Sequence, residues 1–223
     1  MKRFIFAIFV VIGNQLFSQP LQEFRAVKIT NVDSPVLFDD KEIAKGMDYL
    51  ASIGINMVLT VVWNSSGADG DYTLYPSAVM ENYFGRAMHP AFPTGRDPLQ
   101  RVIIEAHRNG MEVLPWFEMG FSTSYSQNGG HILRKFPNWA LKDNQGSLVV
   151  KNGFDWMSGI NPEVQGFIIS LATEILDQYD VDGIEFSDRI PAMPVEGGYD
   201  LETKAIYSAE HNGASPPTNF RDA

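Results

Sequence analysis

Cysteine is absent from this chain of 223 residues, and histidine occurs only four times. Without cysteine there can be neither a disulfide framework nor thiolate chemistry, so the fold has to be stabilised by its apolar core. None of the histidines stands in an H-x-H or H-E-x-x-H spacing; they are His89, His107, His131 and His211. We therefore expect no zinc or other metal site, and no cofactor.

Basic residues are scarce relative to acidic ones. The chain has 17 Lys and Arg against 27 Asp and Glu, which gives a formal net charge of −10. An acidic surface of this kind argues against nucleic acid and against an anionic membrane surface as partners. It suits a neutral or cationic ligand, although charge alone selects none.

No apolar run approaches the roughly 20 residues that a membrane-spanning helix needs. The longest candidate is residues 4–12, which follows Lys2 and Arg3 and precedes small and polar residues at 13–18. This succession is typical of a signal peptide cleaved near Ser18-Gln19. The alternative is a buried N-terminal strand. We expect a secreted or periplasmic protein without a membrane span.

From residue 24 onward, strand patterns alternate with helix patterns. Residues 55–63 form a continuous apolar run, typical of a parallel strand that is buried on both faces. Asp97-Pro98 and Asn161-Pro162 are typical helix starts, with a capping side chain before a proline. The expected strands are 24–30, 55–63, 111–118 and 183–187, and the expected helices follow residues 39, 97 and 161. Pro115 lies inside the third strand, where we expect irregular pairing.

Two long segments interrupt this alternation. Residues 64–96 are rich in Gly, Pro and aromatic side chains and show no period, which favours an ordered lid or binding loop over a flexible linker. Residues 119–160 predict a short helix around 132–136 and a hairpin over 141–150. After Tyr199 the chain is expected to be a loop.

Strands joined by helical crossovers predict a parallel sheet, either doubly wound or a (β/α)8 barrel. No glycine-rich phosphate loop follows the first strand, where residues 31–35 read Asn-Val-Asp-Ser-Pro, and this disfavours a nucleotide-binding fold. Long insertions after the second and third strands favour the TIM barrel. Four strands are half a barrel and would leave two open edges, so we expect residues 24–223 to be the N-terminal part of a truncated barrel; completion by a partner is the alternative.

An ordered set of motifs resembles the glycosyl-hydrolase-like family 10, a family of secreted or lipid-anchored bacterial proteins. The motifs are Arg25-Ala26-Val27, Leu74-Tyr75-Pro76-Ser77, Asp97-Pro98-Leu99, Glu105 to Met111 (EAHRNGM), Trp116-Phe117, Asn161-Pro162-Glu163-Val164 and Tyr179 to Ile184 (YDVDGI). The resemblance covers nearly all of the chain after residue 24. It implies a (β/α)8 barrel related to the α-amylase-like glycosidases, and hydrolysis of O-glycosidic bonds in a polysaccharide.

The fourth strand departs from the family pattern. Many members end this strand in two adjacent aspartates, whereas this chain has Ser187 and Asp188. Ser187 stands at the place that corresponds to the amylase-like nucleophile, and Glu185 stands where His or Gln is frequent. The resemblance implies that the acid/base comes from a later strand.

Glycoside hydrolysis needs two carboxyl groups, one neutral and one ionised. We predict Asp188 and Glu185 as the catalytic residues, because alternation along the strand directs Glu185 into the barrel and Asp188 lies at the strand end. The predicted substrate-binding residues are Trp63, Asn64, Trp116, Glu118, Ser187, Arg189, Glu196 and Tyr199.

Structural roles are open for several of these side chains. Glu185 could be a buried carboxylate paired with Lys or Arg, Asp188 and Arg189 could be an ion pair, and the two tryptophans could belong to the core. Asp182 is expected to be a turn or cap residue. The alternatives to a hydrolase are a glycan-binding barrel without catalysis and a fragment without activity. Both the hydrolase and the glycan-binding barrel would have a carbohydrate as partner.

Overall fold

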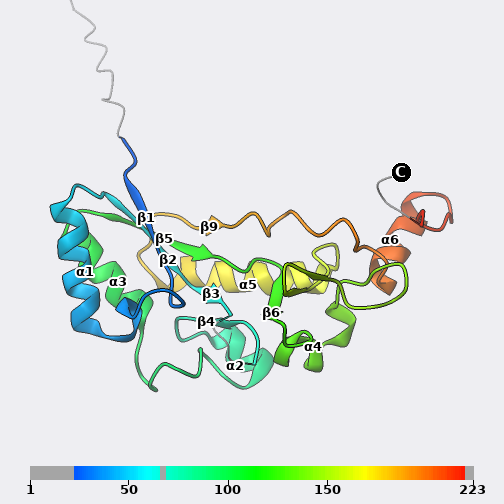
Figure 1. Ribbon diagram of the computed structural model, residues 1–223, viewed down its shortest axis with the longest axis horizontal. Coiled ribbons are helices and arrows are strands. Elements are labelled where there is room, and N and C mark those ends of the chain that lie inside the picture. Colours follow the sequence, from blue (N-terminus) through cyan, green and yellow to red (C-terminus); the bar gives the residue numbers. More distant parts are fainter. Residues whose placement is uncertain (1–22, 66–68, 219–223) are drawn as a thin grey trace, which may run out of the picture.

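The computed structural model describes residues 23–65 and 69–218, so the expected signal peptide lies outside the described residues. A four-stranded sheet has the order β1-β2-β5-β9, and all three strand pairs are parallel. The strands are β1 (Ala26–Ile29), β2 (Met57–Val61), β5 (Glu112–Phe117) and β9 (Glu185–Phe186). The helices between them are α1 (Asp40–Ser52), α3 (Pro98–Arg108) and α5 (Pro162–Gln178) (Figure 1). The expected α/β order with a parallel sheet is confirmed.

The helices begin where the sequence places caps. Asp39 accepts hydrogen bonds from the backbone N–H groups of Lys41 and Glu42 at the start of α1. Asp97 and Asn161 cap α3 and α5 in the same way. Each cap satisfies amide groups that have no partner within the helix.

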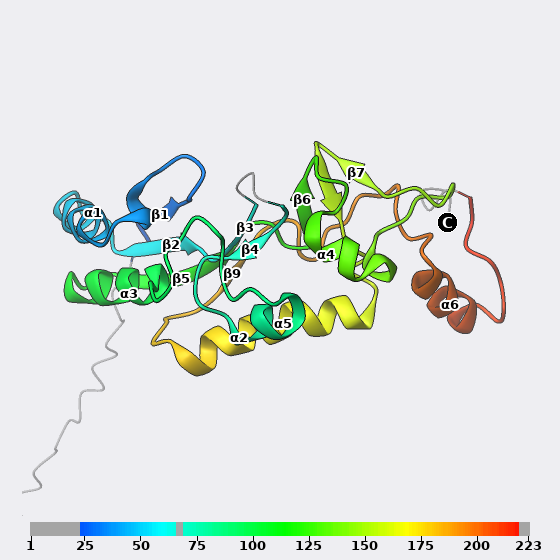
Figure 2. The same cartoon turned by 90° about the horizontal axis from the view of Figure 1, so that it is seen from below.

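The sheet has one covered face and one open face. Burial alternates along β5, so that Val113 and Phe117 are fully buried in the core that α1, α3 and α5 complete. Leu114 and Trp116 point to the opposite face and are only partly buried. Figure 2 shows α5 running lengthwise along the molecule, with α1 and α3 at one end.

Pro115 affects the hydrogen bonding of β5 on the side that faces β9. It pairs in regular register with Thr60 of β2, but the ladder to β9 contains only Trp116↔Glu185 and Phe117↔Phe186. The flanking residues Val113 and Phe117 bond toward the β9 side, since their carbonyl groups accept from Asp182 and Ser187. Pro115 therefore lacks an N–H on that side, which explains why β9 begins late.

Of residues 64–96, the described ones (64–65 and 69–96) form ordered structure, and several of their side chains pack into the core. They contain β4 (Tyr72–Thr73), which pairs with β3 (Trp63–Asn64), and α2 (Ala78–Phe84). Glu174 of α5 accepts hydrogen bonds from Tyr75 and Ser77, at 3.1 and 2.5 Å. These bonds, together with the ring contacts of Tyr83 and Phe84 with Phe167, attach α2 to α5.

Residues 119–160 contain a separate antiparallel sheet of order β6-β8-β7, with β6 (Ser122–Tyr125), β7 (Val150–Lys151) and β8 (Phe154–Trp156). α4 (Gly130–Lys135) confirms the short helix, and η2 (Pro137–Trp139) follows it. Val149 N–H bonds to Leu141 O at 2.9 Å, as a hairpin over 141–150 requires. One further short helix, η1 (Val36–Phe38), follows β1.

The expected loop after Tyr199 is wrong in part, because α6 (Leu201–Glu210) forms there. Asp200 caps it by accepting from the backbone and the hydroxyl of Thr203. The sequence of this helix has no apolar stripe that would predict it, and Leu201 is 87% exposed. α6 lies at the end of the molecule opposite α1 (Figure 1). Within residues 23–65 and 69–218, no helix is long and apolar enough to cross a membrane.

Candidate functional site

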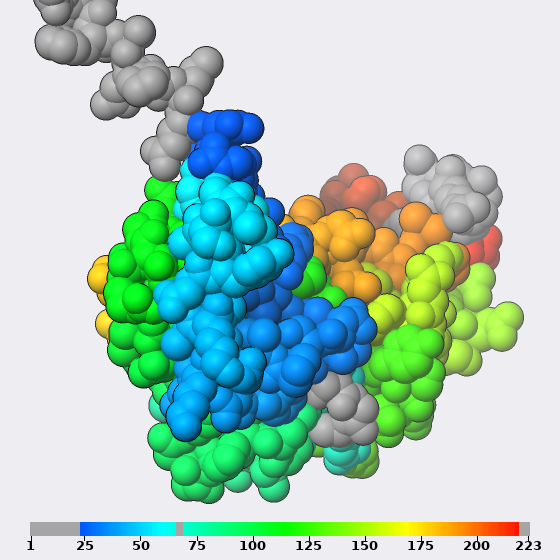
Figure 3. All heavy atoms as spheres, turned by 60° about the vertical axis from the view of Figure 1, so that its left-hand side comes forward, coloured from blue at the N-terminus to red at the C-terminus, as the bar shows by residue number. Residues whose placement is uncertain are grey.

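The carboxyl ends of β1, β3 and β5 open onto a cavity of about 550 Å³. Asn64, Glu118 and Met119 form its floor. One wall is the segment after β1, with Asn31, Val32, Asp33 and Phe38, and the other wall includes Tyr125, Gln127 and Phe154. In Figure 3 the surface is hollowed between the blue N-terminal segments and the green and orange segments. Ligand sites of parallel α/β sheets lie at this edge of the strands.

Glu118 is the carboxyl group at the floor of the cavity. It directly follows β5, is partly buried, and accepts a hydrogen bond from Asn64 Nδ2 at 2.8 Å. Burial raises the pKa of Glu118, although the charges of Arg189 and Lys28 oppose the shift. A carboxyl group of this kind keeps its proton to higher pH and can serve as a general acid.

Asn64 and Asn31 leave hydrogen-bonding capacity at the same floor. Both side chains are buried, and Asn64 Nδ2 also donates to Asn31 Oδ1 at 2.8 Å. Asn64 Oδ1 and Asn31 Nδ2 have no hydrogen-bond partner among the described residues. Buried polar atoms are nearly always paired, so this acceptor and this donor are available to a ligand's hydroxyl or amide group.

Arg189 connects the loop after β9 to Glu118. Its guanidinium group donates to the backbone oxygen of Glu118 at 2.8 Å and lies 4.4 Å from the centre of the Phe154 ring. Its own backbone oxygen accepts from Phe121 N–H at 3.2 Å. Gly120, at φ 55°, allows this approach, because a Cβ there would lie 2.7 Å from the Arg189 backbone. The structure therefore brings Arg189 and Glu118 together.

Glu185 lies on the open face of the sheet with Lys28 and Trp116. Lys28 Nζ is 2.7 Å from Glu185 Oε1 and 4.1 Å from the centre of the Trp116 ring. Glu185 Oε2 is buried and has no hydrogen-bond partner among the described residues. This is the expected alternative of a carboxylate paired with Lys, and a catalytic role for Glu185 stays a prediction.

Asp188 and Ser187 occupy the turn after β9 and do not line the cavity. Asp188 is exposed, and Ser187 Oγ accepts from the Arg189 backbone N–H at 3.2 Å. Trp63 is fully buried, donates to Gly120 O at 3.2 Å and packs edge-on against Phe167. Its ring therefore belongs to the core, where no sugar can stack on it.

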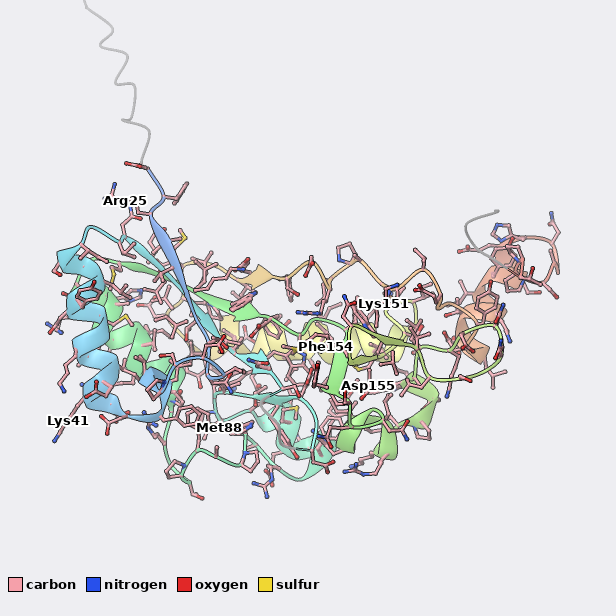
Figure 4. The ribbon with its side chains drawn as sticks, viewed as in Figure 1. Arg25, Lys41, Met88, Lys151, Phe154 and Asp155 are labelled. Carbon is pink, nitrogen blue, oxygen red and sulfur yellow. The ribbon has the colours of Figure 1, made fainter. Side chains whose placement is uncertain are left out.

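Glu196 and Tyr199 lie in the segment between β9 and α6. Glu196 pairs with Lys151 of β7 at 2.7 Å, and the Tyr199 hydroxyl donates to Pro217 O at 2.7 Å. Neither lines the cavity. Figure 4 shows Lys151 near Phe154, its pairing partner across β7 and β8, and Phe154 lies at the cavity wall.

Asp182 lies just before β9 and contacts the amino end of β5, as expected for a turn or cap residue. It accepts from Val113 N–H at 2.8 Å and contacts His107 Nε2 at 3.0 Å. Burial opposes ionisation of Asp182, but these two partners lower its pKa below the usual value.

Sequence reasoning missed most of the residues that line the cavity, and four of the missed residues at or near the cavity show why. Asn31 directly follows the first strand, a position that could have marked it. Tyr125 and Phe154 come from residues 119–160, where no periodicity predicts their direction. Asp71 is fully buried, and burial raises its pKa well above the usual range despite the nearby Ser65 hydroxyl and Arg189. No signal in the sequence distinguishes it from a surface aspartate.

Comparison with known proteins identifies the family of the chain. The family model described as Glycosyl hydrolase-like 10 matches residues 23–223. Glycosyl hydrolase DigH of Escherichia coli (strain K12) is 31% identical over 174 residues, which cover 73% of this chain and 37% of DigH. Glycosyl hydrolase YngK of Bacillus subtilis (strain 168) is 26% identical over 214 residues, 86% of this chain and 39% of YngK. The chain thus spans well under half the length of these relatives.

Solved structures share the fold at low sequence identity. The α-L-fucosidase isoenzyme 2 from Paenibacillus thiaminolyticus superposes with a TM-score of 0.61 and 19% identity, over 90% of this chain and 28% of that one. The exo β-N-acetylglucosaminidase from Vibrio harveyi gives a TM-score of 0.54 and 9% identity, over 85% and 30%. Both of these neighbours are glycoside hydrolases with a TIM-barrel fold. From the family match and the relatives, the chain belongs to the glycosyl hydrolase-like 10 family.

Proposed function

We propose that the protein hydrolyses O-glycosidic bonds of a polysaccharide or oligosaccharide in the cavity above Glu118. One observation carries the proposal: a partly buried carboxyl group with a raised pKa lies at the cavity floor, at the carboxyl end of a parallel strand. Glycosidases need such a group to protonate the leaving oxygen. Membership of a glycosyl hydrolase-like family supports the same reaction class.

Glu118 is assigned as the proton donor, and the second carboxylate comes from the neighbouring strand or its turn. Glu185 is the first candidate, because it lies on β9 beside β5 and is ion-paired with Lys28. Asp188 follows the same strand but is exposed and does not line the cavity, so it is the second candidate. Asn64 and Asn31 would hydrogen-bond the hydroxyl or amide groups of the sugar.

Hydrolysis can be tested with the full-length protein on starch, xylan, cellulose, chitin and peptidoglycan, by measuring reducing ends. On the cleaved polymer, Glu118→Gln should lower the rate by about 100-fold or more while oligosaccharide binding persists. Glu202→Gln, on the exposed side of α6, is the matched control and should leave the rate unchanged. Parent-like turnover by Glu118→Gln would remove Glu118 from the mechanism. Glu185→Gln and Asp188→Asn then identify the second carboxylate by which of them is inactive.

A glycan-binding barrel without catalysis is the second candidate function. Ser187 favours it, because many family members are expected to carry an aspartate at this place. Binding of an oligosaccharide by the full-length protein without turnover of any polymer would select this candidate.

We also infer that the four parallel strands are half of a (β/α)8 barrel. Strand order follows chain order, and both outer strands leave an unpaired edge among the described residues. Long unpaired edges invite aggregation, so a barrel normally closes them. A stable, cooperatively unfolding monomer of residues 24–223 alone would contradict this inference.

Export is the proposed localisation, because residues 1–18 have the succession of a signal peptide. Mass spectrometry of the protein recovered from cells should find a new N-terminus near Gln19. An N-terminus at Met1 would contradict export by this route.

A further inference from the structure

We propose that Tyr125 and Phe154 form a stacking subsite that receives the apolar face of a pyranose ring next to the one cleaved at Glu118. Both side chains line the cavity wall, and the inference rests on the proposed function only in placing the cleaved bond at Glu118. Aromatic rings with an exposed face are suited to the C–H surface of a sugar, which has little other apolar area to offer.

Tyr125 is unusual in combining exposure with fixed geometry. It is 54% exposed at the last position of β6, and it packs edge to face on Phe154, with ring centres 5.1 Å apart at 73°. A single exposed aromatic side chain needs no explanation. A ring that is exposed toward a cavity and held by a second ring has the preorganisation of a binding group.

Gly153 holds one side of the Tyr125 ring. A Cβ at this position would lie 2.5 Å from Tyr125 Cε2 and 2.8 Å from Cζ, so the ring lies directly against the glycine backbone. Gly153 also has φ 83°, a conformation that side chains rarely adopt, and its oxygen accepts from Ser126 N–H at 2.8 Å. Glycine at 153 therefore permits both the turn and the position of the ring.

Phe154 links this ring to the carboxyl group at the floor. The Arg189 guanidinium lies 4.4 Å from the centre of the Phe154 ring and donates to the Glu118 backbone oxygen at 2.8 Å. The cation–π contact and the hydrogen bond fix the two rings relative to Glu118. A sugar stacked on Tyr125 is thereby held at a set position relative to the reacting bond.

The charge of the molecule favours a saccharide over a nucleic acid base as the stacked group. The formal net charge is −10, and Glu118 and Asp33 line the same cavity as Tyr125. The phosphodiester backbone of a nucleic acid is repelled by such a surface, whereas a neutral glycan is not.

Calorimetric titration of the full-length protein with the hexasaccharides of glucose, N-acetylglucosamine and xylose tests the subsite. For the hexasaccharide that binds most tightly, Tyr125→Ala should weaken binding about tenfold, and Tyr125→Phe should stay within about twofold of the parent. Tyr49→Ala is the matched control, because Tyr49 is 64% exposed on α1 and does not line the cavity. It should bind as the parent does.

Each outcome bears on the proposal. Parent-like binding by Tyr125→Ala, or failure of all three hexasaccharides to bind the parent, overturns the subsite. Binding that weakens in Tyr125→Ala but not in Tyr125→Phe supports the subsite. If the parent then cleaves no glycan, the subsite still stands and only the glycosidase assignment fails. Hydrolysis by Tyr125→Ala with the parent's KM overturns the subsite and leaves the glycosidase assignment standing.

Discussion

Lys28 Nζ lies 2.7 Å from Glu185 Oε1, and this ion pair joins β1 and β9, the two outermost strands of the four-stranded sheet. In a flat sheet three strand spacings would separate these strands by about 14 Å. Because side chains stand roughly perpendicular to a sheet, the contact indicates that the sheet curves, with both side chains on its concave face. Trp116 of β5 lies between them, with its ring centre 4.1 Å from Lys28 Nζ. Such curvature is what strands of a barrel need.

The Lys28–Glu185 pair should contribute modestly to stability. Its side chains are 46% and 29% exposed, so solvent screens the attraction. We expect a coupling free energy of about 0.5–1 kcal/mol in a double-mutant cycle of Lys28→Met and Glu185→Gln, measured by urea unfolding. The coupling should shrink as salt is raised from 0.05 to about 1 M. Coupling indistinguishable from zero at low salt would show that the pair does not hold the curved sheet.

The contribution of Asp71 to the free energy of unfolding should decrease as pH rises. Burial raises its pKa well above the usual value, so the folded state keeps a proton that the unfolded state releases. Stability should fall above pH ~4, by up to about 1.4 kcal/mol per pH unit, until pH reaches the folded-state pKa.

Asp71→Asn removes this titration. The difference in unfolding free energy between variant and parent should therefore grow in the variant's favour from pH ~4 to ~7. Gln178→Asn, at an exposed site on α5 with no titratable group, is the control and should show a constant difference. Parallel curves for Asp71→Asn and the parent would mean that Asp71 is ionised in the fold.

Hydrophobic periodicity and capping residues predict most of the frame that positions the site. Asp97 and Asn161 mark helix starts, and the apolar run before Trp63 marks the buried second strand. These signals are local, because a cap acts within one turn and a strand pattern repeats every second residue.

The site itself was predicted less completely, because its geometry depends on turns and on contacts between distant segments. A residue at the carboxyl end of a strand lies at the edge of the sheet where the cavity opens, but the turn that follows decides where its side chain points. Glu118 therefore faces the cavity while Asp188 points to solvent. Tyr125 and Phe154 reach the wall through pairing of β6 with β8, which no local pattern encodes.

Gly120 should be the least replaceable glycine near the site. Its Cβ would lie 2.7 Å from the Arg189 backbone, and its φ of 55° adds strain for any other residue. We expect Gly120→Ala to cost about 2–4 kcal/mol in urea unfolding, from strain together with overpacking. Gly146→Ala is the control, since Gly146 has φ 82° but no atom within 4 Å of the place a Cβ would occupy, and should cost about 1 kcal/mol. Equal losses of unfolding free energy at the two sites would show that the loop with Arg189 can move to make room for a Cβ at little cost.

Asn64 offers a direct test of the raised pKa of Glu118. Asn64→Asp places a second carboxyl group where Nδ2 now lies, 2.8 Å from Glu118 Oε2. Since like charges disfavour ionisation, the pKa of Glu118 should rise further, and the alkaline limb of the pH–rate profile should move up by about one pH unit. Asn64→Leu removes the donor without adding charge and should move the limb less. The position of the limb does not depend on how much of each variant is folded, so a lower yield leaves the comparison intact. An alkaline limb that stays in place in Asn64→Asp would assign it to a group other than Glu118.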